Sequence, residues 1–190
     1  KAPSGGVRML TGYTKGQMFG LYFTINPISR LNIFIDFQRI NSRGRYFNQE
    51  NKSDQLLISS SYYNKSGAYK INGGLQLNRA KNLEWGGVVD TLDFQNNIFS
   101  NRELIPVQLN ASASAARQLL LSLDQQLRIF QVASSEISAF YNFRSTGQSH
   151  SFTSSDSVFV ADAVFQTTTI RDSIRFTMIE NFAGLKWRLE

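Results

Sequence analysis

Few residues of this sequence could take part in catalysis. His150 is the only histidine among 190 residues, and the chain has no cysteine. A nucleophilic triad or a histidine-rich metal site combines several such side chains, so neither can be assembled here. We therefore interpret His150 as a solvated turn residue, and we predict neither an enzyme nor a cofactor. The lack of cysteine also excludes disulfide bonds.

Carboxylates gather in one predicted loop, where Glu84, Asp90 and Asp93 lie close together in the sequence. Oxygen ligands of this kind can bind Ca²⁺. A solvated acidic loop explains them more simply, so we predict no metal. The glycine pairs at 73–74 and 86–87 do not indicate a phosphate-binding loop, because the Lys-Ser/Thr of a P-loop does not follow them.

Amides and charged residues occupy alternate positions in several segments. In residues 31–40, LNIFIDFQRI, they alternate with Leu, Ile and Phe, and the same pattern recurs at 68–79. Successive side chains of a β-strand point to opposite faces, so each such strand has a polar and an apolar face. If the polar face lines a pore, its candidate lining residues are Asn32, Asp36, Gln38, Lys70, Asn72, Gln76, Asn78, Gln108, Asn110, Asp124, Gln126 and Arg128.

The composition favours a membrane barrel. Charged residues make up 18% of the chain, below the roughly 25% of ordinary soluble domains. No apolar run approaches the roughly 20 residues of a transmembrane helix, and only helices and closed barrels satisfy their backbones in lipid. The net charge of +6 is scattered along the chain, which argues against a nucleic-acid partner.

The chain is predicted to consist almost entirely of strands. A loose N-terminal segment, 1–6, precedes a β-barrel domain over 7–190. A helix competes only at 118–130, where we favour a strand because the flanking segments are strands of similar length. A phase slip predicts a bulge near Asn181. The predicted strands are 7–13, 17–25, 30–40, 54–63, 68–79, 106–114, 118–130, 135–144 and 173–189.

The connections between these strands alternate in length. Short turns are predicted at 26–29, 64–67, 115–117 and 145–148, and long loops at 41–53, 80–105 and 152–172. The short connection at 131–134 is an exception, because its place in the order predicts a long loop. Short periplasmic turns and long external loops are typical of outer-membrane barrels. We therefore predict an all-β, antiparallel transmembrane barrel of about ten up-and-down strands, with Leu31, Ile33, Ile35 and Phe37 facing lipid.

Three stretches resemble the putative porin family of Bacteroidota, a large group of outer-membrane barrels. They are YFTINPISRLNIFIDFQRINSRGRYFNQE, LNRAKNLEWGGVVD and TTTIRDSIRFTMIENFAGLKWRLE, and the resemblance covers most of residues 12–189. Trp85 stands where the family pattern would have Asn. Family members are usually much longer, so the resemblance implies an incomplete piece of a wider barrel in the bacterial outer membrane.

Two functions fit this prediction. The first is a porin-like barrel for passive passage of small solutes, and the alternative is a structural or accessory subunit of an outer-membrane assembly or secretion complex with a closed lumen. A soluble carbohydrate-binding sandwich is a third, more distant alternative. We expect outer-membrane lipid, and also other outer-membrane proteins, as partners. The Asp-Thr-Leu and Asp-Ser-Val tripeptides resemble periplasmic O-glycosylation acceptors, with Thr91 and Ser157 as the modified residues.

Overall fold

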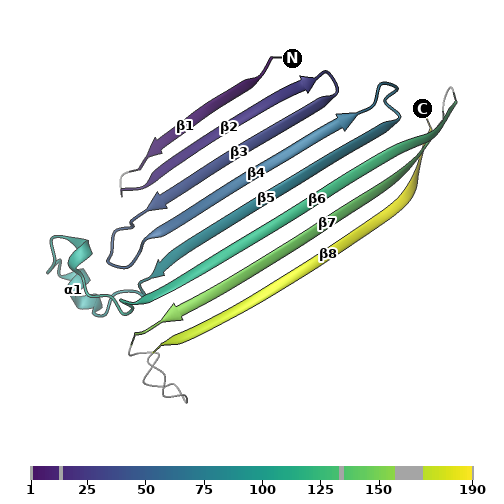
Figure 1. Ribbon diagram of the computed structural model, residues 1–190. Coiled ribbons are helices and arrows are strands. Elements are labelled where there is room, and N and C mark those ends of the chain that lie inside the picture. Colours follow the sequence, from purple (N-terminus) through teal and green to yellow (C-terminus); the bar gives the residue numbers. More distant parts are fainter. Residues whose placement is uncertain (1, 13–14, 133–134, 157–168, 190) are drawn as a thin grey trace.

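The computed structural model of the chain describes residues 2–12, 15–132, 135–156 and 169–189. These residues form one antiparallel sheet of 8 strands, in which each strand pairs only with its neighbours in the chain (Figure 1). The strands are β1 (Ser4–Thr11), β2 (Gln17–Ile28), β3 (Leu31–Ser42), β4 (Asn51–Tyr63), β5 (Tyr69–Glu84), β6 (Ser112–Val132), β7 (Ser135–Ser154) and β8 (Ile170–Leu189). The helical segments are α1 (Thr91–Gln95) and the 3-10 turn η1 (Arg102–Leu104). Neither segment of the described chain has the length and apolar character of a transmembrane helix.

The register of the strands sorts the side chains onto two faces. Ile35 of β3 lies directly opposite Phe23 of β2 and Ile58 of β4, while Gln38 lies opposite Gln55. Directly opposed residues share a face, so apolar residues of one strand meet apolar residues of the next. We call the side that carries Ile35 the apolar face and the side that carries Gln38 the polar face.

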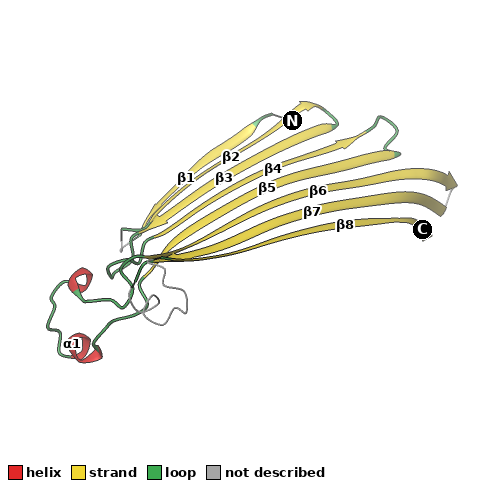
Figure 2. Ribbon diagram, turned by 60° about the horizontal axis from the view of Figure 1, so that its bottom comes forward, coloured by secondary structure: helices red, strands yellow, loops and turns green. Residues whose placement is uncertain are grey.

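The sheet is a single curved layer, and no second layer of described residues packs on it (Figure 2). Within the described ranges, the buried hydrophobic residues are Ile105 and Val107, which lie in the β5–β6 loop. The accessible surface is 13435 Å² for a mass of 21.5 kDa, against roughly 9200 Å² for a compact monomer of that mass. The large apolar side chains of the strands therefore need an apolar environment outside the chain.

The connections sort by length between the two ends of the sheet (Figure 1). At one end, called the turn end, residues 29–30 and 64–68 join neighbouring strands. At the other, called the loop end, the connections include 43–50 and 85–111. The short turns predicted at 26–29 and 64–67 and the long loops predicted at 41–53 and 80–105 thus have counterparts at the expected ends of the sheet. The exception at 131–134 disappears, because β6 ends at Val132 and β7 begins at Ser135, both at the turn end.

Two predicted turns, at 115–117 and 145–148, are wrong. Residues 115–117 pair with both β5 and β7, and residues 145–148 pair with both β6 and β8. A reversal at either place would leave backbone N–H and C=O groups without partners, so the strands continue and the sheet has 8 strands instead of about ten. His150 is consequently an exposed strand residue and not a turn residue. The strand predicted at 118–130 is confirmed as part of β6.

The bulge predicted near Asn181 is also wrong. β7 and β8 pair along their full length without a register shift. The apparent phase slip arises because Met178 and Ile179 are both apolar although successive strand residues point to opposite faces. The irregularity in this part of the sheet lies instead in β6, between Arg128 and Phe130.

The sheet is open. β1 and β8 form its edges and do not pair with each other, so the chain shows an up-and-down antiparallel sheet without a closed barrel. The strands lengthen along the chain, from 8 residues in β1 to 20 in β8. β1 begins at Ser4, so half of the segment predicted as loose, 1–6, belongs to the first strand.

Candidate pore-lining face and loop cluster

Most of the predicted pore-lining residues lie together on the polar face. Asn72 of β5 is directly opposite Asp124 of β6, and Lys70 is opposite Gln126. The residues of β3 reach the same face through their pairs in β4. The structure therefore places on one face Asn32, Asp36, Gln38, Lys70, Asn72, Gln76, Asn78, Asp124, Gln126 and Arg128.

Gln108 and Asn110 do not lie on this face, so their grouping with the other candidates is wrong. Strand β6 begins after them. The alternation seen over 106–114 comes largely from a loop segment, in which Val107 forms an isolated bridge with Val88. Both residues therefore belong to the β5–β6 loop at the loop end of the sheet.

A row of amides crosses the polar face. Each strand from β3 to β7 contributes one residue, which lies directly opposite the residue of the next strand. In strand order these residues are Gln38, Gln55, Asn78, Gln118 and Gln148. Asn78 Nδ2 donates to Gln118 Oε1 at 2.8 Å. An amide both donates and accepts hydrogen bonds, so this row can hold water or a polar solute without carrying charge. Sequence reasoning missed Gln118 because it placed a turn just before it, and missed Gln148 because it placed that residue within a turn. Continuous alternation through β6 and β7 would have found both.

A hollow of about 340 Å³ lies on the polar face towards the turn end. It brings together four of the predicted residues, Lys70, Asn72, Asp124 and Gln126. Lys186 of β8 also lines it. Ammonium, carboxylate and amide groups thus lie side by side, and the hollow can contact polar groups of either sign.

Opposite charges face one another on the polar face. Arg8 Nη2 lies 3.1 Å from Asp36 Oδ1 near one edge of the sheet. Towards the other edge, Arg144 of β7 is directly opposite Glu180 of β8. Opposite charges at such positions stabilise strand pairing modestly. The polar face therefore combines amides with balanced charge, as is typical of the interior of an outer-membrane barrel.

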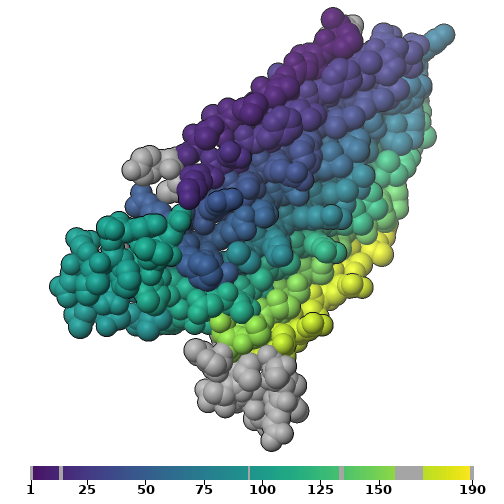
Figure 3. Space-filling view, turned by 60° about the vertical axis from the view of Figure 1, so that its left-hand side comes forward, coloured from purple at the N-terminus to yellow at the C-terminus, as the bar shows by residue number. Residues whose placement is uncertain are grey.

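The loops at the loop end form one connected cluster. Tyr46 in the β3–β4 loop stacks on Trp85 in the β5–β6 loop, with ring centroids 4.7 Å apart and planes 6° from parallel. Asn48 Nδ2 donates to the carbonyl oxygens of Glu84 at 2.7 Å and Leu109 at 3.2 Å. These contacts fasten the β5–β6 loop, which projects beyond the strands as a compact lobe (Figure 3).

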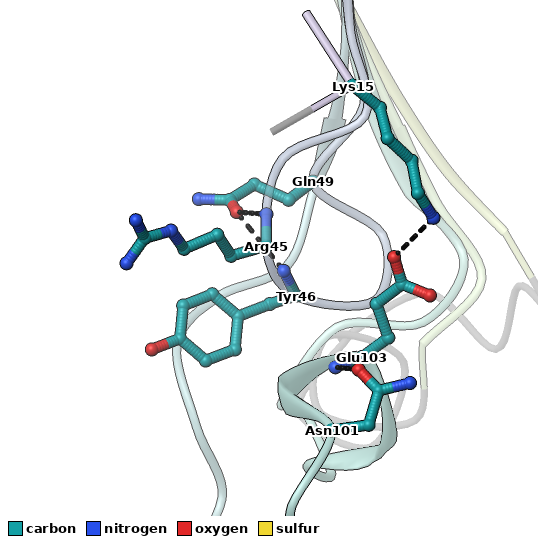
Figure 4. Close-up of polar contacts among 6 residues, drawn as sticks. All are labelled: Lys15, Arg45, Tyr46, Gln49, Asn101 and Glu103. Atoms are coloured by element: carbon teal, nitrogen blue, oxygen red, sulfur yellow. Dashed lines mark hydrogen bonds and ion pairs between the residues drawn. The ribbon is translucent and has the colours of Figure 1, made fainter. Parts of the chain in front are cut away.

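Polar contacts extend the cluster to a third loop (Figure 4). Lys15 Nζ lies 2.9 Å from Glu103 Oε1, which joins the β1–β2 loop to η1. Asn101 caps η1, because its Oδ1 accepts the Glu103 backbone N–H at 3.0 Å. Gln49 Oε1 accepts the backbone N–H of Arg45 at 2.9 Å and that of the next residue at 3.3 Å. Each loop thus has its own polar contacts as well as links to its neighbours.

Asp156 anchors the connection after β7 to the start of β6. Its Oδ1 accepts the backbone N–H groups of Asn110 at 2.8 Å and Ala111 at 3.1 Å. Its Oδ2 accepts hydrogen bonds from the Ser112 and Ser154 hydroxyls. Burial alone would raise the pKa of Asp156, but these hydrogen bonds to the ionised carboxylate together hold the pKa below its ordinary value.

Of the two predicted modification sites, Thr91 lies in the β5–β6 loop at the same end. Thr91 is the exposed first residue of α1. The Asp90 carboxylate accepts the Leu92 backbone N–H at 2.7 Å, and this helix-capping contact explains the Asp-Thr pair without a modification. Ser157 lies outside the described residues. In the described part of the chain, no group of three or more His, Cys, Asp or Glu side chains could hold a metal ion.

An up-and-down sheet with one polar and one exposed apolar face is typical of the wall of a porin-like barrel. A family model described as "Putative porin" matches residues 1–190. The chain therefore belongs to the putative porin family, as its resemblance predicted. Neither the curated proteins nor the solved structures contain a match to it. Family membership supports a porin-like role and suggests an outer-membrane location in general terms, while the assignment to Bacteroidota stays a prediction.

Gly44 of the β3–β4 loop should be less replaceable than Gly67 of the β4–β5 connection. Its φ is +73°, and an added Cβ would lie 2.5 Å from Gln49 Oε1, which already binds two backbone amides. Gly67 has φ +68° but open space around its Cβ position. A left-handed conformation costs an alanine about 1 to 2 kcal/mol at either site. We expect Gly44→Ala to lower the unfolding temperature in detergent clearly more than Gly67→Ala; equal losses would contradict the clash.

Protonation of Asp156 should loosen the loop cluster. Its folded pKa lies below the unfolded value of 3.8, so its stabilising contribution is present above that value and is lost as the pH falls through the folded pKa. We expect the hydrogen-exchange protection factors of the Asn110 and Ala111 amides to fall below about pH 4. Asp156→Asn should lower them already at pH 7. Protection that stays constant down to pH 2 would contradict the assigned anchor.

Proposed function

We propose that this chain forms part of the wall of an outer-membrane β-barrel, through which small polar solutes pass by diffusion. The observation that carries the proposal is the amide row that crosses the polar face from Gln38 to Gln148. A water-filled lumen needs such a lining, and a row of neutral amides binds a passing solute weakly enough to release it.

The apolar face supports the same proposal. Phe23, Leu77, Leu121 and Ile179 are large side chains on this face, and all are exposed. Exposed apolar area of this extent marks a surface that contacts another apolar phase. Tyr69 to Leu77 are nine consecutive residues of β5, within the roughly 9 to 11 residues with which a tilted strand crosses a bilayer. Contact with lipid would remove these apolar side chains from water, which no described residue of the chain does.

Closure of the barrel is part of the proposal. β1 and β8 are open edges in this chain, and in hydrocarbon each unpaired backbone group costs several kcal/mol. We infer that neither edge stays unpaired in the membrane. Either β1 and β8 pair with each other after a change of curvature, or each pairs with a strand outside this sheet. Membership of the putative porin family supports this closure.

The alternative function is a structural or accessory barrel subunit with a closed lumen. The loop cluster favours it, because Lys15–Glu103 and the Tyr46–Trp85 stack hold the loops together at one end of the sheet. Loops held in this way could close the passage. Electrical measurement separates the two functions, since a closed lumen carries no steady current.

The first test is planar-bilayer conductance of the purified protein under a KCl gradient. We expect steady channels, and we expect Gln118→Glu to shift the reversal potential towards cation selectivity, because it adds a negative charge to the amide row. Gln95→Glu, in the exposed helix α1, adds the same charge in a loop beyond the ends of the strands and should change selectivity much less. Folded protein without conductance would favour the closed-lumen alternative.

The second test concerns the orientation of the two faces. Leu75 and Gln76 are consecutive residues of β5, so their side chains point to opposite faces. Leu75→Arg should cost about 2 to 4 kcal/mol of stability in a bilayer, whereas Gln76→Arg should be tolerated. The measurement is folding yield into vesicles, read by heat-modifiable migration on a gel. Equal yields for both variants would refute the assignment of the apolar face to lipid.

A further inference from the structure

Towards the loop end, the side chains of the apolar face change from aliphatic to mostly cationic between one register row and the next on that face. Leu77 and Leu119, which are directly opposed, still belong to the apolar band. Two residues further along each strand comes a row of directly opposed residues that we call the basic row. It runs from β3 to β8 and consists of Arg39, Asp54, Arg79, Arg117, Ser149 and Arg175. The residues on this side of the sheet thus pass from aliphatic to cationic at a single level.

The charges of the basic row are only partly balanced. Arg39 is satisfied, because its Nε lies 2.6 Å from Asp54 Oδ1. Arg79 and Arg117 are directly opposed and exposed, and Arg175 is exposed as well. Among the described residues, none of these three forms an ion pair with a carboxylate. Like charges directly opposite destabilise a strand pair, so an anion between the arginines would relieve a repulsion built into the sheet.

Two adjoining hollows lie at this level. The first, of about 260 Å³, is lined by Leu77 and Leu119 together with the three unbalanced arginines. Gly147 lies in its floor, where a Cβ would meet no atom within 4 Å. The second, of about 540 Å³, shares Arg117, Arg175 and Ser149 with the first and adds Ser151 and Ser173. One hollow therefore combines aliphatic and cationic groups, and the other combines cationic groups with hydroxyls.

The opposite end of the apolar face lacks this arrangement. Tyr62 and Tyr141 lie in one register row there, Tyr69 lies in the next, and Trp187 lies beyond. Tyr and Trp are the usual residues at a bilayer interface and select no particular head group. On the polar face, moreover, Arg144 is opposite an acid. The apolar face thus gathers three arginines, Arg79, Arg117 and Arg175, at one level only. The acid of that row, Asp54, is paired with Arg39.

We propose that the basic row binds a membrane lipid whose phosphate-bearing head group has a net negative charge, unlike the zwitterionic head group of phosphatidylcholine. Arginine guanidinium groups bind phosphate oxygens in a bidentate manner, and serine hydroxyls can donate to the remaining oxygens. Arg79, Arg117 and Arg175 would hold the phosphate, Ser149 and Ser151 would contact the polar head group, and Leu77 and Leu119 would contact the acyl chains. This proposal rests on the proposed function, since the site must face the bilayer.

The test compares lipid retention by the full chain and two variants in detergent. The probes are dioleoyl phosphatidic acid and dioleoyl phosphatidylcholine, supplied in equal amounts, with bound lipid counted by native mass spectrometry. The site variant is Arg79→Gln, Arg117→Gln, Arg175→Gln. The control variant, Arg30→Gln, Arg43→Gln, Arg45→Gln, loses the same charge in connections outside the strands. Removing like charges relieves repulsion, so the site variant should fold, which heat-modifiable migration checks.

We expect the unmodified chain and the control variant to retain phosphatidic acid over phosphatidylcholine by tenfold or more, and the site variant to lose that preference. Equal retention by both variants, or no preference in the unmodified chain, would overturn the proposal. A further arm adds inorganic phosphate alone. Displacement of the lipid by millimolar phosphate would show a free-phosphate site and also overturn it. Conductance measured on the same samples separates the lipid site from the proposed solute passage. A preference for phosphatidic acid in samples that form no channels would contradict the solute passage but not the lipid site.

Discussion

The register of the β-ladder is the constraint on which the rest of the structure depends. The pairs β3–β4, β4–β5, β5–β6 and β7–β8 contain no register shift, and the shifts in the other two long pairs lie near the turn end. A slip of a single residue would move every side chain of a strand to the opposite face. The amide row, the apolar band and the basic row therefore follow together from one register.

The second constraint is the absence of a packed second layer among the described residues. Soluble domains bury one face of a sheet against another element, whereas here the buried residues Ile105 and Val107 lie in a loop. The backbone of the inner strands is satisfied by the ladder, but the apolar face is not covered. The sheet thus supplies its own hydrogen bonds and takes its hydrophobic stabilisation from its surroundings, which is the division expected of a barrel in lipid.

Strict alternation made part of this structure predictable from the sequence. Segments 30–40 and 68–79 alternate almost without interruption, so their strands and faces could be predicted from side-chain type alone. At 115–117 and 145–148, runs of Ala, Ser, Thr and Gly carry little contrast between the faces, and turns were predicted where the ladder continues.

Other features depend on partners far away in the chain. Gln55 and Gln118 join the amide row only through the register of β4, β5 and β6. The opposition of Arg79 and Arg117 likewise requires the β5–β6 register across a long loop. The contacts of Asp156 with Asn110 and Ala111 link residues on different connections. The sequence contains these residues, but local patterns do not indicate which of them meet.

The pairing of every strand with its chain neighbour has a consequence for how the molecule assembles. Within the sheet, every strand after β1 pairs with the strand that precedes it in the chain. Strands can therefore be added to the sheet in the order in which they are synthesised, one hairpin at a time. The entropy of closing a connection grows only slowly with its length, so even residues 85–111 delay the addition of β6 modestly. Under the proposed closure, only the two outer edges, β1 and β8, find their partners late, and that step is the one at which assembly would be most open to assistance or to failure.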